Sequence, residues 1–433
     1  MTGLMIAAPQ SGAGKTTVTL ALLRALARQG VDVRSAKAGP DYIDPAFHAA
    51  ASGSACVNLD PWAMRPELVA SLAAPAGESA FVVEAMMGLF DGAADGTGSA
   101  ADLAALLGLN VVLVVDCAKQ SHSVAALVRG FATHRPGVAL AGLILNRVGS
   151  ARHAALLREA LAPLAIPVLG VLPRAAELAL PERHLGLVQA GEHAELAAFL
   201  ERAADWVTAG CDLDALAALA AQAPAPATSG GGAAVAPLAP LGQHIAVARD
   251  EAFAFAYPHL LDGWRRAGAT LDFFSPLADE APAKDVNAIY LPGGYPELHG
   301  GTIAAAGAFR RGMREAAARA IPIYGECGGY MVLGAGLTDG DGTRHPMLDL
   351  LPLETSFATR RLHLGYRRLQ ETDGFVWPGR LRGHEFHYAT IISEGPGEAL
   401  FTAEDARGAD LGRFGRRKGG VCGSFLHVID REA

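Results

Sequence analysis

Short apolar runs alternate with amphipathic stretches over the first 170 residues of the chain. Helical patterns separate the runs, and the first of them, TTVTLALLRALARQ, is closed by Gly30. Alternation of this kind predicts a mostly parallel sheet with helices on both faces. The runs are rich in Val, Ile and Leu, as strands buried on both faces would be. They cover residues 4–8, 31–36, 80–86, 110–116, 140–146 and 166–172.

A second segment repeats the pattern after residue 242. Its predicted strands are IAVARD, TLDFFSP, AIYLPGG, IPIYGEC and SFLHVI, and a helical stretch is predicted over 301–320. Residues 221–242 lie between the segments and consist mainly of Ala, Pro, Gly and Ser, with no charge and no period, which is typical of a linker. We therefore predict two α/β domains, 1–220 and 243–433, joined by this linker.

Composition narrows the classes of function. Of the 433 residues, 51% are hydrophobic and 18% are charged, which excludes a disordered chain. The net charge of −8 argues against a general nucleic-acid or anionic-membrane surface. No apolar run reaches the ~18 residues of a membrane span, and the N-terminus lacks the basic region of a signal peptide. Five scattered cysteines without a CxxC pair fit a reducing compartment, so we expect a cytoplasmic protein.

The first predicted strand runs into PQSGAGKTT and then into a helix. This segment matches the P-loop pattern of GxxxxGK followed by Ser or Thr, except that Pro9 replaces the first glycine. Backbone amides and the helix N-terminus would bind phosphates, Lys15 would reach the β- and γ-phosphates, and Thr16 would ligate Mg²⁺. Asn146 ends the strand 140–146, where it could meet a purine edge. The predicted ATP-binding residues are Gly12, Gly14, Lys15, Thr16, Thr17 and Asn146.

Acidic residues follow the strands on the P-loop side of the predicted sheet. Glu84 stands where a Walker-B acid belongs, Asp91 lies seven residues later, and Asp41 and Asp44 follow the second strand. Any one of them could be a helix cap or a turn residue. Together, because ligands gather at the carboxyl ends of parallel strands, they predict metal or substrate binding. Lys37 ends the second strand and could hold a substrate carboxylate.

Cys327 follows an apolar strand and precedes a helical pattern in IPIYGECGGYMVLG. A nucleophile on a sharp strand-to-helix turn needs such flanking glycines, and the helix N-terminus would lower the pKa of the thiol. His427, in SFLHVI, is the predicted base. Backbone amides of Gly294 and Gly328 are predicted to form an oxyanion hole. The alternative is a core cysteine, which the glycine setting disfavours.

Two further histidines, His384 and His387, lie in RGHEFHY. Their spacing exceeds by one residue that of a pair on the same face of a strand. A zinc pair lacks a third ligand nearby, so we favour a structural or substrate-contact role.

Taken together, the motifs resemble those of the glutamine-dependent a,c-diamide synthases of cobalamin biosynthesis. The resemblance spans nearly the whole chain through PQSGAGKTT, KAGPDYIDPAFH, EAMMGLFDG, LPERHLGLV, VARDEAFAFAYP, FFSPLADE, LPGGYPE, GECGGYM and GHEFHY. Such enzymes convert the a- and c-acetates of hydrogenobyrinic or cobyrinic acid to carboxamides, using ATP and glutamine. The resemblance implies a cytoplasmic ligase with an N-terminal domain like dethiobiotin synthetase and a C-terminal class I glutamine amidotransferase domain.

The resemblance also assigns roles. Thr16, Asp41 and Glu84 would bind Mg²⁺ beside the nucleotide, and Cys327 with His427 would release ammonia from glutamine through a thioester. ATP would convert the corrinoid carboxylate to an acyl phosphate that ammonia attacks. The residues implied for the substrate are Lys37, Tyr42, Asp44 and Asp91.

Two departures from the wider amidotransferase pattern put a catalytic triad in doubt. Ile429 replaces the acid two residues after the histidine, and Met331 replaces a common glutamine. A Cys–His dyad is therefore the prediction.

Two other functions remain as alternatives. One is a sister amidase for other corrin side chains or nickel sirohydrochlorin. The other is a P-loop ATPase switch with an inactive amidotransferase domain, against which Gln10 argues because switch ATPases carry a lysine there. The sequence leaves open the cobalt content of the substrate, the order of amidation, the ammonia path and the oligomeric state, including a homodimer.

Overall fold

The computed structural model describes residues 3–74, 79–183, 186–221, 235, 237–372 and 376–432. It forms two compact units, one of residues 1–62 and 66–234, the other of residues 63–65 and 235–433. Most of the predicted linker 221–242 lies outside the described residues, and the predicted domain limits stay predictions. In the part of the chain described, no helix has the length and hydropathy needed to cross a membrane.

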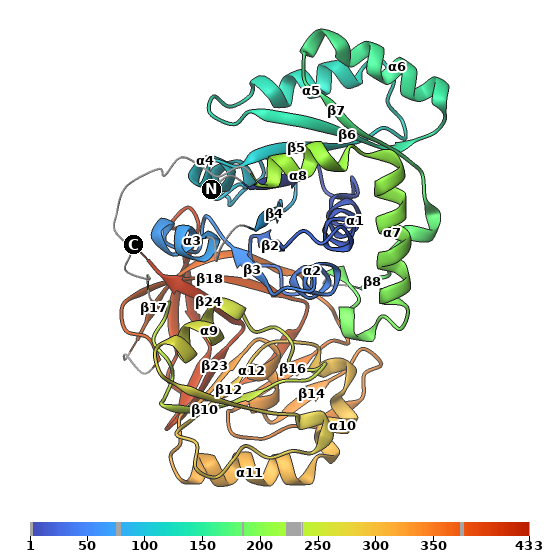
Figure 1. Cartoon of the computed structure of the whole chain (residues 1–433). Helices are drawn as coiled ribbons and strands as arrows, with labels where there is room; N and C mark the ends of the chain where they lie inside the picture. The colour runs from blue at the N-terminus through green and yellow to red at the C-terminus, as the bar shows by residue number, and fades with distance from the viewer. Residues whose placement is uncertain are drawn as a thin grey trace. The chain divides into compact units, whose positions relative to one another are not determined.

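A seven-stranded parallel sheet with the order β3-β2-β4-β1-β5-β6-β7 forms the first unit. Its strands are β1 (Leu4–Ala7), β2 (Val33–Ala38), β3 (Cys56–Leu59), β4 (Ala80–Glu84), β5 (Asn110–Asp116), β6 (Leu140–Val148) and β7 (Val168–Pro173). The helices are α1 (Lys15–Arg28), α2 (Asp44–Ser52), α3 (Pro66–Ala73), α4 (Ala100–Leu107), α5 (Val124–Thr133), α6 (Ala151–Leu161), α7 (Leu196–Gly210) and α8 (Leu213–Ala221). Helix α1 packs against α2 and α7, and α5 lies beside α6 (Figure 1).

The second unit has a parallel sheet of its own. Its order is β11-β10-β12-β13-β23, with β22 added antiparallel at the edge. The strands are β10 (His244–Ala248), β11 (Thr270–Phe274), β12 (Ala288–Leu291), β13 (Ile323–Glu326), β22 (Arg416–Lys418) and β23 (Val421–Ser424). The helices are α9 (Pro258–Arg266), α10 (Gly300–Ala305), α11 (Gly307–Ala318) and α12 (Gly328–Leu333).

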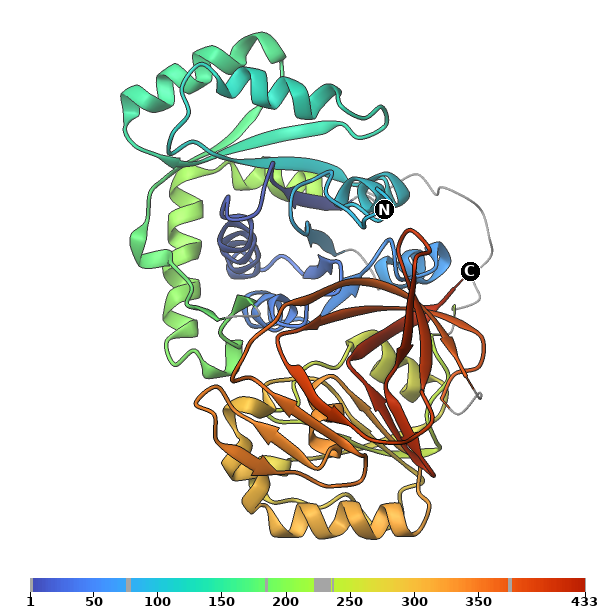
Figure 2. The ribbon, with the colours of Figure 1, turned by 180° about the vertical axis from the view of Figure 1, so that it is seen from behind.

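Two antiparallel sheets complete the second unit, and Figure 2 shows most of their strands in orange and red. Their orders are β15-β14-β16-β19 and β21-β20-β17-β18-β24, apart from one parallel pair, β14 with β16. The strands are β14 (Gly336–Thr338), β15 (Arg344–Pro346), β16 (Leu353–Ser356), β17 (His363–Glu371), β18 (Arg380–His387), β19 (Thr390–Glu394), β20 (Phe401–Asp405), β21 (Asp410–Phe414) and β24 (Leu426–Arg431). A further short pair, β8 (Glu182–Arg183) and β9 (Gly186–Leu187), belongs to the first unit.

Three sequence expectations need correction. The strand expected over 31–36 begins at Val33, because the amide of Val31 still bonds the end of α1, donating to the Leu26 carbonyl. The helix expected over 301–320 is two helices that meet at Ala306. The run SFLHVI is divided between sheets, since Ser424 ends β23 and Leu426 begins β24.

Gly329 is the point of closest approach between α12 and the parallel sheet. A Cβ atom added there would lie 2.0 Å from the carbonyl oxygen of Leu291 on β12. Neither backbone can move away easily, since the Gly329 amide also donates to the Pro292 carbonyl. The last glycine of GECGG therefore sets how closely the helix after Cys327 packs.

We expect Gly329→Ala to lower the free energy of unfolding by about 1–3 kcal/mol, because the added methyl group overpacks a backbone contact. Thermal or denaturant unfolding of the full chain measures it. Gly301→Ala is the matched control, because Gly301 is also helical but its added Cβ lies 3.8 Å from the nearest atom. Equal stability of the two variants would contradict this explanation.

Candidate active sites

The P-loop is shaped by two glycines with left-handed backbones. Gly12 has φ 76° and Gly14 has φ 95°, conformations that favour glycine. A Cβ at Gly14 would also meet the Nδ2 atom of Asn146 at 2.4 Å. That Nδ2 atom donates to the Ala13 carbonyl at 2.9 Å, so Asn146 holds the loop from β6. Its contact with a purine stays a prediction.

Buried at the end of β4, Glu84 joins the P-loop to β2 and α2. Its Oε1 atom accepts hydrogen bonds from Thr16 Oγ1 at 2.6 Å and Lys37 Nζ at 2.7 Å, and its Oε2 lies 2.7 Å from His48 Nε2. Lys37 Nζ also lies 2.5 Å from Asp44 Oδ2. Two predicted residues from separate elements, Thr16 and Lys37, thus contact the carboxylate of the predicted Glu84. His48, which sequence reasoning missed, contacts it as well.

Charges in this cluster stabilise one another. Burial alone would raise the pKa of Glu84, but Lys37 and His48 hold it well below its usual range. Burial also opposes the charge on His48, yet Cys56 and Glu84 outweigh it and raise the pKa of His48 to about 10. The pKa of Lys37 is raised by Asp44 and Glu84 against the effect of burial. The cluster therefore contains an ionised Glu84 between two cations.

The other predicted acids surround this cluster without joining Glu84. Asp41 Oδ1 accepts from the amides of Ile43 and Asp44, so it caps the start of α2, and the half-buried Tyr42 lies in this turn. Asp91 Oδ2 accepts from the Gly88 amide at 2.8 Å, in a turn that packs on the carbonyl of Pro9. Asp91 thus lies beside the P-loop, as its place in GLFDG suggests.

Lys15 turns its amine toward the same turn. Its Nζ donates to the Met87 carbonyl at 2.6 Å. Burial and the nearby Lys37 lower the pKa of Lys15, although Glu84 opposes the change.

Beside the P-loop lies a cavity of about 580 Å³, within the usual size of a ligand pocket. Its polar lining includes Lys15, Thr16, Thr17, Asn146, Arg147 and Arg174, with Gly12, Gly14 and Trp206. Hydroxyl and carboxylate oxygens at Thr16 and Glu84 are the hard donors that Mg²⁺ prefers, and Mg²⁺ takes few protein ligands beside phosphate oxygens. The residues present therefore fit a magnesium nucleotide.

In the second unit, Cys327 sits on a strained turn between β13 and α12. Its φ of 46° and ψ of −103° are rare for a residue with a side chain. His427, on β24, approaches it from the other side. A Cβ added at Gly293 would lie 3.3 Å from Cys327 Cβ and 2.6 Å from His427 Cε1. Both side chains therefore crowd one point, as a nucleophile and its base would.

Glu326 is an acid near His427 that the sequence pattern does not indicate. Its Oε2 lies 3.6 Å from His427 Nδ1. The carboxylate accepts hydrogen bonds from Tyr290 Oη at 2.8 Å, Tyr324 Oη at 2.9 Å and the Val428 amide at 3.1 Å. Sequence reasoning missed it by searching after the histidine, whereas it directly precedes the nucleophile.

One electrostatic expectation is wrong. The sequence predicts a lowered thiol pKa at the helix N-terminus, but burial and the charge of Glu297 raise the pKa of Cys327. The Gly328 amide alone acts in the expected direction. Since α12 has only six residues and Cys327 is 3% exposed, desolvation dominates. The resting sulfur is thus a neutral thiol that needs a base.

The predicted oxyanion-hole residues lie side by side. A Cβ added at Gly328 would meet the backbone nitrogen of Gly294 at 2.9 Å. Gly294 is itself pressed against the Ala252 carbonyl, which a Cβ there would reach at 2.1 Å. The two glycines are therefore neighbours, and the oxyanion hole stays a prediction.

His384 and His387 occupy opposite faces of β18, as their spacing predicts. His384 is paired with His427 of β24, and burial together with His427 lowers the pKa of His384 to about 3. His384 is therefore a neutral neighbour of the proposed base.

Both halves of the chain match known domain families. Residues 4–188 match the CobQ/CobB/MinD/ParA nucleotide binding domain, and residues 244–433 match the CobB/CobQ-like glutamine amidotransferase domain. The chain is 63% identical over 433 residues to hydrogenobyrinate a,c-diamide synthase of Brucella anthropi, covering 99% of both chains. The enzyme of the same name from Rhizobium meliloti is 62% identical over 432 residues, covering 99% of each chain. The Rhodobacter capsulatus enzyme of that name is 53% identical over 435 residues, covering 99% of this chain and 98% of the relative.

The chain belongs to the hydrogenobyrinate a,c-diamide synthase family. The resemblance seen in the motifs is thereby confirmed, as is the expected pairing of a P-loop domain with an amidotransferase domain. The Glu84 cluster lies in the part of the chain that matches the nucleotide binding domain, and Cys327 lies in the part that matches the amidotransferase domain.

We expect Glu84→Gln to lower the free energy of unfolding by about 3–5 kcal/mol, because it leaves His48 buried without its carboxylate and Lys37 with Asp44 as its remaining ion-pair partner. Denaturant unfolding of the full chain measures the loss. Glu159→Gln, at an exposed position on α6, is the control and should change little. A Glu84→Gln chain as stable as the control would refute the proposed charge balance.

We expect Glu326→Gln to reduce glutamine hydrolysis by about tenfold or more, because the imidazolium formed at His427 loses its counter-charge. Glutamate release measures the rate, and thermal unfolding checks that the variant folds. Glu398→Gln, exposed in the same unit, should keep the wild-type rate. Wild-type hydrolysis in a folded Glu326→Gln chain would remove Glu326 from the mechanism.

Proposed function

We propose that this chain converts the a- and c-acetate carboxylates of hydrogenobyrinic acid to carboxamides, at the expense of ATP and glutamine. The identity of 63% over the full length to an enzyme of that name carries the proposal. The two candidate sites support it, because the reaction needs an activated carboxylate and a source of ammonia.

The first unit activates the carboxylate. Lys15 and the amides at the start of α1 bind the phosphates and stabilise the charge that develops as the γ-phosphoryl group moves to the substrate oxygen. Thr16 and Glu84 would hold Mg²⁺, which neutralises phosphate charge when bound, and Asp41 would support this site. The product of this step is an acyl phosphate.

Residues around the second strand position the substrate acid. Lys37, buried and cationic, offsets the repulsion between the incoming carboxylate and Glu84. Tyr42, Asp44 and Asp91 complete the proposed substrate-binding set. Ammonia attacks the acyl phosphate carbon, and inorganic phosphate leaves.

The second unit makes the ammonia. His427 takes the proton of the Cys327 thiol, and the sulfur attacks the amide carbon of glutamine. Gly294 and Gly328 donate to the oxyanion, while Glu326 stabilises the imidazolium. The leaving nitrogen takes a proton from His427 and departs as ammonia, and water then hydrolyses the thioester to glutamate.

The alternatives are weaker. Among the described residues, no feature favours nickel sirohydrochlorin, and the proximity of Cys327, His427 and Glu326 argues against an inactive amidotransferase domain. Cobyrinic acid differs from hydrogenobyrinic acid in containing cobalt, and the relatives are named for hydrogenobyrinate.

Hydrogenobyrinic acid incubated with the chain, ATP, Mg²⁺ and glutamine should gain two amides, counted by mass spectrometry. Cys327→Ser should abolish the glutamine-dependent reaction, because it removes the nucleophile, and should keep the reaction driven by ammonium salts. Lys15→Ala should abolish both reactions and keep glutamine hydrolysis.

Cys422→Ser, at the other cysteine of the second unit, is the matched control and should amidate with glutamine. Retained glutamine-dependent amidation in Cys327→Ser would overturn the nucleophile. Amidation of cobyrinic acid or nickel sirohydrochlorin in place of hydrogenobyrinic acid would overturn the substrate.

A further inference from the structure

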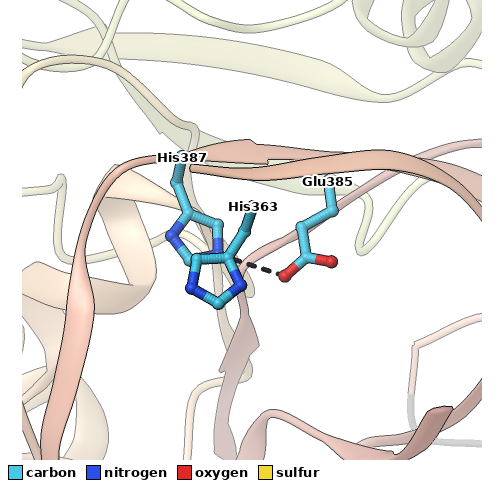
Figure 3. A group of neighbouring side chains, drawn as sticks. All are labelled: His363, Glu385 and His387. Carbon is cyan, nitrogen blue, oxygen red and sulfur yellow. Dashed lines mark hydrogen bonds and ion pairs between the residues drawn. The ribbon is translucent and has the colours of Figure 1, made fainter. Parts of the chain in front are cut away.

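Three potential metal ligands gather on one face of the β17–β18 ladder. His363 is paired with His387 across the ladder, and Gly365 is paired with Glu385, so the side chains at 363, 385 and 387 share a face. One ligand atom from each of His363, Glu385 and His387 lies within 4.8 Å of the others. Figure 3 shows the three side chains converging from the two strands. None of them has a role in the proposed amidation.

His387 is oriented by its backbone partner. Its Nδ1 atom lies 3.1 Å from the Ala389 carbonyl oxygen. Because a carbonyl oxygen only accepts, Nδ1 carries the hydrogen, and in a neutral ring Nε2 then presents a lone pair. This Nε2 faces Glu385 Oε1 at 3.1 Å. Two facing lone pairs need a cation between them, either a proton or a metal ion.

The second oxygen of Glu385 is already fixed. Arg367 donates to Oε2 through Nε at 2.9 Å and Nη2 at 2.6 Å. Its guanidinium thus holds the carboxylate by one oxygen and leaves Oε1 directed at His387. A partner of this kind orients a monodentate ligand in many metal sites.

In the absence of an ion the two imidazoles stack on each other. The ring of His387 lies between that of His363, with centroids 4.6 Å apart and an angle of 5°, and that of Phe425, with centroids 3.9 Å apart. Glu385 and His387 are buried, whereas His363 is half-buried and gives solvent a route to the cluster. Because a metal ion lies in the plane of each imidazole that binds it, His363 must rotate out of this stack to share an ion with His387, and it is the less buried of the two rings.

We propose that His363, Glu385 and His387 form a binding site for a divalent transition metal ion. Two imidazoles and one carboxylate suit a borderline ion such as Zn²⁺, with water in the remaining position. Mg²⁺ prefers oxygen ligands, so it belongs at the P-loop and not here.

Zn²⁺ is the probe for the test. The full chain carries Cys327→Ala, which removes the thiol of the amidotransferase site as a competing ligand, and excess Mg²⁺ saturates oxygen sites. Competition with a chromophoric chelator should give one Zn²⁺ per chain that His363→Ala and Glu385→Gln each weaken by about tenfold or more. His122→Ala, which replaces an exposed histidine in the turn before α5, should bind Zn²⁺ with the affinity of the parent chain.

Two further readouts separate a metal site from a purely structural cluster. Zn²⁺ should raise the unfolding midpoint of the parent and not that of His363→Ala, whose half-buried side chain can be removed with the fold retained. Co²⁺ should give visible absorption that the same variant loses. Absence of Zn²⁺ binding, or equal affinity in the parent, His363→Ala and Glu385→Gln, would overturn the proposal and leave an ion-pair cluster alone.

Discussion

A buried carboxylate at the carboxyl end of a parallel strand must be compensated, or its desolvation would cost several kcal/mol. Each unit contains one, and each compensates it differently. Glu84 is neutralised by the cations Lys37 and His48. Glu326 is held by two tyrosine hydroxyls and an amide, with His427 within ion-pair distance. The first arrangement fixes a charge beside a phosphate loop, and the second leaves a negative charge ready for an imidazolium. Both proposed reactions depend on these carboxylates staying in place.

Strand positions were largely predictable because parallel strands buried on both faces are continuous apolar runs, as 110–116 shows by matching β5. The misses have physical causes. β3 has the sequence CVNL, whose Asn58 interrupts the run while its amide bonds the carbonyls of Gly39 and Asp41. The antiparallel strands β17 and β21 are half-exposed, and charged residues on their open faces hide the pattern. Local apolar periodicity does not indicate which strands pair when they lie far apart in the sequence.

The residues of the candidate sites also fall into those that local sequence predicts and those that it does not. Motifs placed the P-loop and the Cys327 turn, because both need glycines at fixed spacings within a few residues. Partners from distant segments had no such signal: Glu326 meets His427 across 101 positions, and His48 meets Glu84 across 36. The helix effect on Cys327 was misjudged because sequence shows the direction of a helix but not the burial of its first residue.

A neutral, nearly inaccessible sulfur at Cys327 also leaves the idle enzyme chemically quiet. Oxidants and alkylating agents react with thiolates. Burial of Cys327 limits their access, and its raised pKa keeps the sulfur protonated. Burial of the sulfur thus also protects it from oxidation between turnovers.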